Sequence, residues 1–186
     1  MPYTRLILVR HGETIANRSY RYIGISDEPL SEHGLAQAQQ LAGALSILPI
    51  NAVYTSPLQR AYRTAMPIAE RLGLEAGQLD ALSECSFGAW EGLTRAEVMA
   101  SGEEHALHLQ AWERNAALAP PGGESFAEMR RRVCSAVERL ALEHPDQAIA
   151  LVSHVGPIKV LLCTAMGAPL SSAFRIFLDP ATISVI

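Results

Sequence analysis

The sequence predicts an α/β fold, a three-layer α/β/α sandwich in which helices cover both faces of a mainly parallel central sheet. Short apolar runs of strand length alternate along the chain with longer segments that carry apolar residues at helical spacing. This alternation is typical of parallel sheets with helical connections. The 186 residues, of which 49% are hydrophobic, suffice for one domain with a sizeable core.

Apolar runs of strand length recur from one end of the chain to the other. A run without polar residues indicates a strand that is buried on both faces, as in a parallel sheet. Strands are expected at residues 6–9, 52–55, 148–152 and 182–186, and residues 79–87 alternate between apolar and polar as a half-buried strand does.

Apolar residues at helical spacing predict four longer helices between these strands. Ser31 is a favourable N-cap for the first helix, and Ser56-Pro57 is expected to cap and begin the second. Gly73 should end that second helix, and Pro67 inside it should kink or break it. The helices are expected at residues 32–48, 57–72, 124–143 and 158–166.

The segment between residues 88 and 120 follows no single period. Residues 91–118 have a helical composition that Ser101-Gly102 interrupts, and the run Pro120-Pro121-Gly122-Gly123 is expected to be a loop. We expect residues 88–120 to form a cap-like insertion over the sheet, so that residues 1–186 make up a single domain.

Charge and composition narrow the classes of function. The net charge of −4 argues against partners such as nucleic acid or an anionic membrane surface. No apolar run reaches the roughly 18 residues that span a membrane, and the N-terminus does not have the pattern of a secretory signal. Cys85, Cys134 and Cys163 are scattered and odd in number, which fits reduced thiols and a cytoplasmic location. No Gly-Lys-Ser/Thr sequence is present, which excludes a P-loop nucleotide site.

Two histidines follow two of the predicted strands at equivalent positions. His11 comes directly after Arg10 at the end of the first strand, His154 follows the strand at 148–152, and a glycine follows each histidine within two residues. If these strands are neighbours, both imidazoles meet at the edge where open α/β sheets bind ligands. Histidine can act as a nucleophile and arginine matches a phosphate, so the sequence predicts a phosphate-handling site.

Arg60 and Glu84 are further candidates, each with a structural alternative. Arg60 follows the strand at 52–55 in the first turn of a helix, where it either shares a pocket with Arg10 or forms a surface salt bridge. Glu84 lies in apolar surroundings, where a raised pKa would suit a general acid. An ion pair between Glu84 and an arginine is the equal alternative.

Other polar and aromatic residues favour structural interpretations. His105 and His108 are three residues apart but have no further ligands in a familiar pattern, so a solvated face is favoured over a metal site. The consecutive side chains of Arg130-Arg131-Arg132 point in different directions on a helix, which again indicates a solvated face. Trp90 and Trp112 are expected to be packing residues.

Six segments of the chain resemble the motifs of the histidine phosphatase superfamily, the phosphoglycerate mutase-like proteins. They follow one another in the family's order over nearly the whole chain, and together they are highly specific. The segments are residues 8–14 (LVRHGET), 29–38 (PLSEHGLAQA), 55–65 (TSPLQRAYRTA), 84–92 (ECSFGAWEG), 122–125 (GGES) and 152–156 (VSHVG).

The resemblance implies a phosphoglycerate mutase-like fold and a role for each candidate residue. His11 would attack the phosphorus atom and become a phosphohistidine. Arg10, Arg60 and His154 would hold the phosphoryl oxygens, whose charge spreads in the transition state. Glu84 would protonate the leaving oxygen and then help a water molecule to attack the phosphohistidine.

The resemblance also implies a set of substrate contacts. Asn17 and Thr14 would add neutral donors, and Gly24 and Val155 would contact the substrate. Ile23 stands where many phosphatase relatives have glutamine, so the chain departs from the family at that contact. No cofactor and no metal ion are implied.

Residues 87–92 and 122–125 resemble the phosphatase branch, in particular α-ribazole phosphatases and broad-specificity acid-type phosphatases. The expected function is metal-independent hydrolysis of a small phosphorylated metabolite, with residues 18–28 and 88–120 holding its alcohol part. The alternatives are a cofactor-dependent phosphoglycerate mutase and a catalytically inactive domain that binds a phosphorylated ligand. The sequence leaves open the identity of the ester, whether the protein is a homodimer, and whether the native chain continues beyond Ile186.

Overall fold

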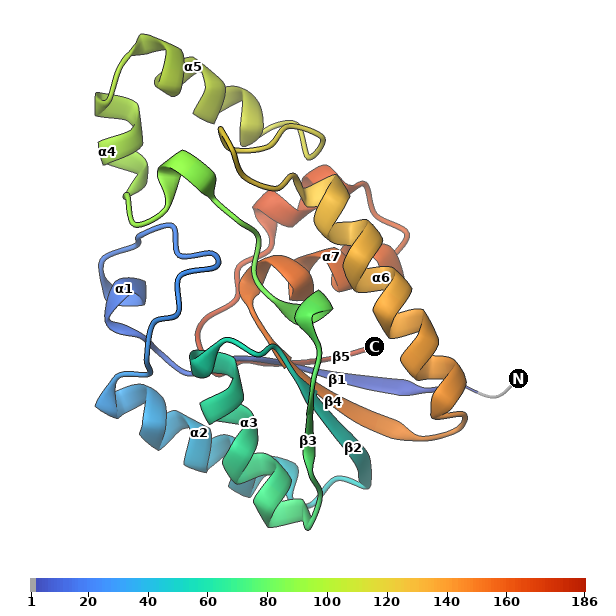
Figure 1. The fold of residues 1–186 in the computed structure, drawn as a ribbon. Helices are drawn as coiled ribbons and strands as arrows, with labels where there is room; N and C mark the ends of the chain where they lie inside the picture. Colours follow the sequence, from blue (N-terminus) through green and yellow to red (C-terminus); the bar gives the residue numbers. More distant parts are fainter. Residues whose placement is uncertain (1–2) are drawn as a thin grey trace.

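Five strands form one sheet at the centre of the computed structural model, which describes residues 3–186. Their order across the sheet is β3-β2-β4-β1-β5. β4 pairs in parallel with β1 and with β2, β2 pairs in parallel with β3, and only β5 runs antiparallel, at the edge beside β1 (Figure 1). The predicted mainly parallel sheet is confirmed. The strands are β1 (Arg5–Arg10), β2 (Ile50–Thr55), β3 (Ala76–Gln78), β4 (Ala148–Ser153) and β5 (Ile183–Val185).

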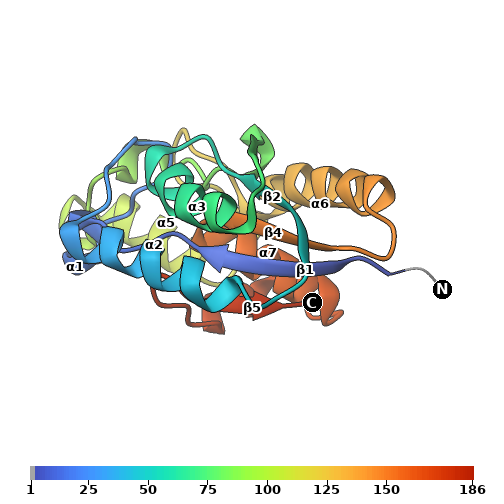
Figure 2. The same cartoon turned by 90° about the horizontal axis from the view of Figure 1, so that it is seen from below.

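Helices cover both faces of this sheet and make three layers. One face carries α2 (Glu32–Leu45) and α3 (Gln59–Leu72), and the other carries α6 (Phe126–Glu143) and α7 (Val155–Ala165), as Figures 1 and 2 show. Successive side chains of a strand point to opposite faces. Leu8 of β1 therefore packs in the cluster under α6 and α7, whereas Val9 packs in the cluster under α2 and α3.

Two residues predicted to end helices, Ser31 and Gly73, lie at the ends of α2 and α3, whereas the break predicted at Pro67 is absent. Ser31 caps α2 by accepting a hydrogen bond from the backbone N–H of Gly34 at 3.0 Å, as predicted. Gly73 ends α3 with a φ of 68°, a left-handed conformation that suits glycine. The predicted kink or break at Pro67 does not interrupt α3, which runs through it to Leu72, because its buried face is held against the sheet.

The segment after β3 differs from its predicted strand at residues 79–87. Only β3 joins the sheet there, and the chain then turns away through a short 3₁₀ helix, η1 (Asp80–Leu82). The helical composition of residues 91–118 is confirmed, with a break at Ser101-Gly102, and these helices lie beyond the ends of β1, β2 and β4 (Figure 1). They are η2 (Gly88–Trp90), α4 (Arg95–Ala100) and α5 (Glu103–Trp112).

Two tryptophans anchor this outer segment to the rest of the molecule. Trp90 and Trp112 are buried and meet edge to face, with ring centroids 5.6 Å apart, so their predicted packing role is confirmed. The remaining short helices are α1 (Ile15–Arg18) and η3 (Leu170–Arg175). Within residues 3–186, no helix combines the length and the apolar character needed to cross a membrane.

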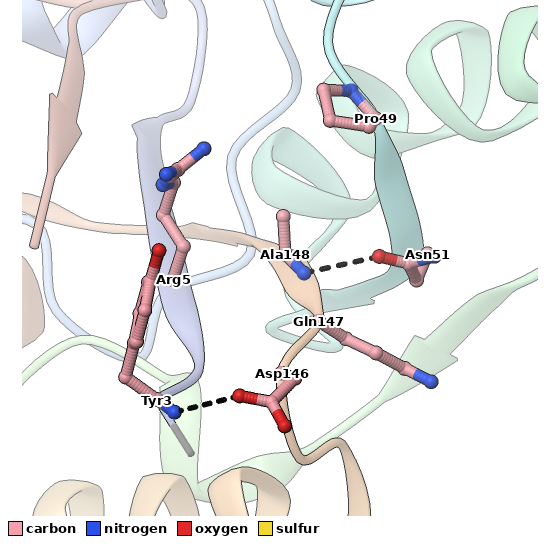
Figure 3. Close-up of a pocket in the computed structure, with 7 residues that line it drawn as sticks. All are labelled: Tyr3, Arg5, Pro49, Asn51, Asp146, Gln147 and Ala148. Atoms are coloured by element: carbon pink, nitrogen blue, oxygen red, sulfur yellow. Dashed lines mark hydrogen bonds between the residues drawn. The ribbon is translucent and has the colours of Figure 1, made fainter. Parts of the chain in front are cut away.

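A small cavity of about 220 Å³ lies at the opposite end of the sheet, where β1, β2 and β4 begin (Figure 3). Two side-chain hydrogen bonds join residues of its lining. The Asn51 side chain accepts from the backbone N–H of Ala148 at 3.0 Å, and the Asp146 carboxylate accepts from the backbone N–H of Tyr3 at 3.1 Å. The pairing of β2 with β4 is irregular at this point, and the Asn51 amide supplies an acceptor there. These contacts fix the strand starts.

Candidate active site

The two histidines meet at the carboxyl ends of β1 and β4. Arg10 is paired with Ser153 in the last register position of these parallel strands, so the residues that follow, His11 and His154, leave the sheet side by side. Their ring centroids are 5.1 Å apart, and both side chains are buried. The sheet edge predicted to collect both imidazoles therefore does so.

The backbone after β1 fixes the tautomer of His11. Nδ1 of His11 lies 2.7 Å from the carbonyl oxygen of Gly12. A carbonyl oxygen only accepts, so Nδ1 carries the proton. Burial, together with the positive charges of Arg10 and Arg60, holds the pKa of His11 well below its ordinary value. The ring is therefore neutral at pH 7, and Nε2 carries a lone pair.

Gly12 allows the chain to turn tightly at this point. A Cβ atom on Gly12 would lie 2.5 Å from the carbonyl oxygen of Gly34, so a larger residue would push α2 away from the site. The N–H of Gly12 donates to the hydroxyl of Thr64 at 3.0 Å, and this hydroxyl donates to the carbonyl of Arg60 at 2.7 Å. Thr64 thus ties the turn at His11 to the helix that carries Arg60.

His154 contacts Ser56, a residue that was predicted from the sequence to cap a helix. Its Nε2 lies 2.8 Å from the hydroxyl oxygen of Ser56, and Nδ1 has no partner among the described residues. Burial and the neighbouring His11 lower the pKa of His154 well below its ordinary value, so this ring is also neutral. The predicted N-cap role of Ser56 is wrong: α3 begins at Gln59, with Leu58 as its N-cap, which frees Ser56 to contact His154.

Two arginines bring positive charge to the histidines. Arg60, in the first turn of α3, is buried and donates to the carbonyls of Ser26 and Gly24 at 2.7 and 2.6 Å. Arg10 donates to the carbonyl of Leu178, and its Nε is buried without a partner among the described residues. No carboxylate of residues 3–186 lies within ion-pair distance of either guanidinium, so Arg60 does not form the alternative surface salt bridge.

Glu84 lies beside these arginines with its carboxylate held by the backbone. One oxygen accepts from the N–H of Cys85 at 2.8 Å, and the other accepts from the N–H of Gly156 at 3.1 Å. Burial raises the pKa of Glu84, while these two bonds and the charges of Arg60 and Arg10 oppose the rise. Since neither arginine is within ion-pair distance, the carboxyl is oriented by backbone donors.

Arg132 supports Glu84 from α6, and sequence reasoning missed it. Its side chain donates to the carbonyls of Ala81 and Glu84 at 2.7 and 3.2 Å and pairs with the Glu124 carboxylate at 2.7 Å. The solvated face predicted for the three consecutive arginines is therefore wrong at this position. Helical spacing could have separated Arg132 from Arg131, because Arg132 lies three residues after Met129 and four before Ala136, on the buried face of α6.

The four residues predicted to contact the substrate, Thr14, Asn17, Gly24 and Val155, make different contacts in the structure. Thr14 and Asn17 cap α1 reciprocally: the Thr14 hydroxyl accepts from the backbone of Asn17, and the Asn17 side-chain oxygen accepts from the backbone of Thr14. Gly24 supplies the carbonyl that orients Arg60. Asn17 and Val155 line a cavity next to Arg10.

Ligand sets for a metal ion are not found in the described residues. Across residues 3–186, no three His, Cys, Asp or Glu side chains are grouped so that they could hold an ion. The solvated face predicted for His105 and His108 is wrong at His108, which is half-buried: it donates to the carbonyl of Ala119 at 2.7 Å, and its ring packs edge-on against Trp90.

Comparison with known proteins identifies the family. Residues 6–186 match the model of the histidine phosphatase superfamily, branch 1. The bifunctional protein Rv2228c of Mycobacterium tuberculosis is 42% identical over 183 residues, which are 98% of this chain and 50% of that protein. The chain thus spans about half the length of this relative. Phosphoserine phosphatase 1 of Hydrogenobacter thermophilus is 38% identical over 183 residues, 98% of this chain and 85% of that protein.

A solved structure and a further relative agree with this result. The mycobacterial glucosyl-3-phosphoglycerate phosphatase Rv2419c in complex with VO3 has a TM-score of 0.88 at 32% identity, and the match covers 97% of this chain and 90% of that chain. An adenosylcobalamin/α-ribazole phosphatase of Salmonella typhimurium is 33% identical over 183 residues, 98% of this chain and 89% of that protein. The predicted fold and the resemblance to phosphatase members are confirmed. The chain belongs to the histidine phosphatase superfamily, branch 1.

Proposed function

We propose that the chain is a phosphomonoesterase that hydrolyses a small phosphorylated metabolite through a phosphohistidine on His11. The observation that carries this proposal is the state of His11. Its ring is neutral, its proton is fixed on Nδ1 by Gly12, and its remaining nitrogen has a lone pair. The guanidinium groups of Arg10 and Arg60, which have no carboxylate partner among the described residues, lie close enough to lower its pKa. They would attract a phosphate to it.

In the first step, Nε2 of His11 forms a bond to phosphorus, and the bond from phosphorus to the ester oxygen breaks. Glu84, whose pKa is raised by burial, gives its proton to that oxygen, so that the alcohol leaves neutral. Arg10, Arg60 and His154 donate hydrogen bonds to the phosphoryl oxygens. Because their positions are fixed before the substrate arrives, they stabilise the charge that develops on these oxygens.

In the second step, a water molecule attacks the phosphohistidine. The carboxylate of Glu84 takes a proton from the water, the bond between Nε2 and phosphorus breaks, and inorganic phosphate forms. This returns Glu84 to its acid form and His11 to its neutral form, so the cycle closes without another reactant. The amide of Asn17, the hydroxyl of Thr14 and the substrate-facing Gly24 and Val155 complete the proposed site.

We propose that this chemistry is independent of metal ions, because arginine and histidine donors can neutralise the phosphoryl charge. We further propose that residues 88–120 cap the site and that the protein is cytoplasmic. The free thiols of the three cysteines support that location. Relatives named as phosphoserine, glucosyl-3-phosphoglycerate and α-ribazole phosphatases support a small phosphate ester as substrate.

The test is release of inorganic phosphate from a panel of phosphate monoesters that includes p-nitrophenyl phosphate, with and without EDTA. We expect release that EDTA does not abolish. Loss of activity in EDTA that a divalent ion restores would overturn metal independence. Rapid interconversion of 3- and 2-phosphoglycerate with negligible phosphate release would show a mutase. Binding of phosphate esters without either reaction would show an inactive binding domain.

A further inference from the structure

A cavity of about 520 Å³ adjoins the site at Arg10. Its walls come from the end of β1, from α1, from α7 and from the segment that leads into β5. That segment is bonded to the end of β1, since Ala181 donates to the carbonyl of His11 and Arg10 donates to the carbonyl of Thr182 (Figure 1). The cavity is therefore built from the same backbone that positions the nucleophile.

Lys159, the single lysine of the chain, lines this cavity. It lies four residues after Val155 on α7, so both side chains are on one face of the helix and both border the cavity. The side chain is half-buried, and no carboxylate of residues 3–186 lies within ion-pair distance of its ammonium group. Burial lowers the pKa of Lys159, and the charge of Glu84 opposes this.

Two carboxylates share the cavity with Lys159, and neither forms an ion pair with it. Glu13 pairs with Arg18 at 2.7 Å and accepts from the hydroxyl of Ser31 at 2.8 Å. Asp179 is exposed, and its charge acts on Arg10, whose pKa it raises against the larger effect of burial. A half-buried ammonium without a counter-charge is unfavourable unless an anion reaches it. Of the three cations that line the cavity, Arg18 is paired with Glu13, whereas Arg10 and Lys159 have no carboxylate of residues 3–186 within ion-pair distance. Arg10 already belongs to the proposed phosphate site, so Lys159 is the one left for a second anion.

We propose that Lys159 binds an anionic group on the alcohol part of the substrate while His11 receives the phosphoryl group. The inference rests on the proposed function and names its substrate class: phosphate monoesters whose alcohol carries a carboxylate or a second phosphate. Tyr20 and Phe177, each 83% exposed, also line the cavity and would cover the carbon skeleton between the two anions. Tyr20 has a φ of 52°, a strained conformation that is frequent at binding sites.

Two matched pairs of substrates test this inference. In the first pair, 3-phosphoglycerate has a carboxylate where glycerol 3-phosphate has a hydroxymethyl group. In the second, 1,3-propanediol bisphosphate differs from 3-hydroxypropyl phosphate by its second phosphate. For one pair or both, we expect Lys159→Met to reduce the ratio of kcat/KM between the anionic and the neutral member roughly 10- to 100-fold, the range for a hydrogen bond to a charged group. Lys159→Arg should retain most of the ratio.

The control is Arg71→Met, which removes one exposed positive charge at the end of α3 and should leave both ratios unchanged. A change in the first pair alone identifies a carboxylate, and a change in the second alone identifies a phosphate. If Lys159→Met leaves both ratios unchanged while all four esters are hydrolysed, the inference is wrong. If the wild type hydrolyses no ester, the proposed function fails instead. Calorimetric binding of 3-phosphoglycerate to the wild type and to Lys159→Met then decides separately whether Lys159 binds the anion.

Discussion

Replacing Glu84 by glutamine should slow the reaction to an extent that depends on the leaving group. Glutamine has nearly the shape of glutamate but has no proton to give to the ester oxygen. General acid help is typically worth about 10²- to 10⁴-fold in rate. An alkyl phosphate, whose alcohol leaves poorly, should lose that factor. p-Nitrophenyl phosphate should lose much less, because its leaving group departs readily without a proton.

The structure adds a cost in stability that the experiment must separate from catalysis. The two oxygens of Glu84 accept from the N–H groups of Cys85 and Gly156. Glutamine can accept from only one of them, and its amide group faces the other. A buried donor without an acceptor costs about 1–3 kcal/mol, so Glu84→Gln should lower the free energy of unfolding by about this amount. Glu128→Gln changes an exposed carboxylate of the nearby α6 cap and serves as the matched control.

Single-turnover measurements separate formation of the phosphohistidine from its hydrolysis, which Glu84 is also proposed to assist. The burst rate should fall far more for an alkyl phosphate than for p-nitrophenyl phosphate. Equal slowing of the burst for both esters in a folded Glu84→Gln protein would refute the role of Glu84 as the acid. Glu84 would then be a structural residue that holds Cys85 and Gly156 together.

Three further predictions follow from the same geometry. Arg132→Met should lower the free energy of unfolding by about 1–3 kcal/mol and slow alkyl more than aryl esters, because it frees the backbone of Glu84, whereas Arg131→Met should do neither. Arg60→Lys should lower kcat/KM by about 10²-fold or more, because lysine cannot donate to two carbonyls and a phosphoryl oxygen in one plane; unchanged kcat/KM would contradict this. Below pH 6.5 the unfolded chain binds more protons than the folded one, because the pKa values of His11 and His154 are lowered from 6.5. The free energy of unfolding should therefore fall as the pH drops below that value, by up to about 1.4 kcal/mol per pH unit for each histidine, with the raised pKa of Glu84 acting in the opposite direction; a flat urea-denaturation profile there would contradict the neutral state of both rings.

The sequence predicted the site residues that directly follow buried strands. β1 and β4 are buried on both faces, so they read as continuous apolar runs, and the residues that follow such runs lie at the carboxyl edge of the sheet. His11, His154 and Arg10 could be found in this way. Arg60 could be placed near them because it opens the helix after β2.

The parts that the sequence could not predict depend on contacts between distant segments. The strand predicted around Glu84 is absent because the chain leaves the sheet after β3 and is tied by Arg132 from α6. Ser56 followed by Pro57 matches a helix start, yet α3 begins two residues later and Ser56 contacts His154 instead. In each case a tertiary contact outweighs the local propensity from which the prediction was made.

Trapping the covalent intermediate tests the central claim most directly. The protein is mixed with labelled substrate, quenched within one turnover in alkaline denaturant, and the labelled peptide is analysed by mass spectrometry and ³¹P NMR. We expect an acid-labile, base-stable phosphate on Nε2 of His11, since Nδ1 is held by Gly12. His11→Asn should abolish both label and turnover, whereas His33→Asn, a change at an exposed histidine, should leave both intact. Label on another residue, or full turnover in the His11→Asn protein, would contradict the account.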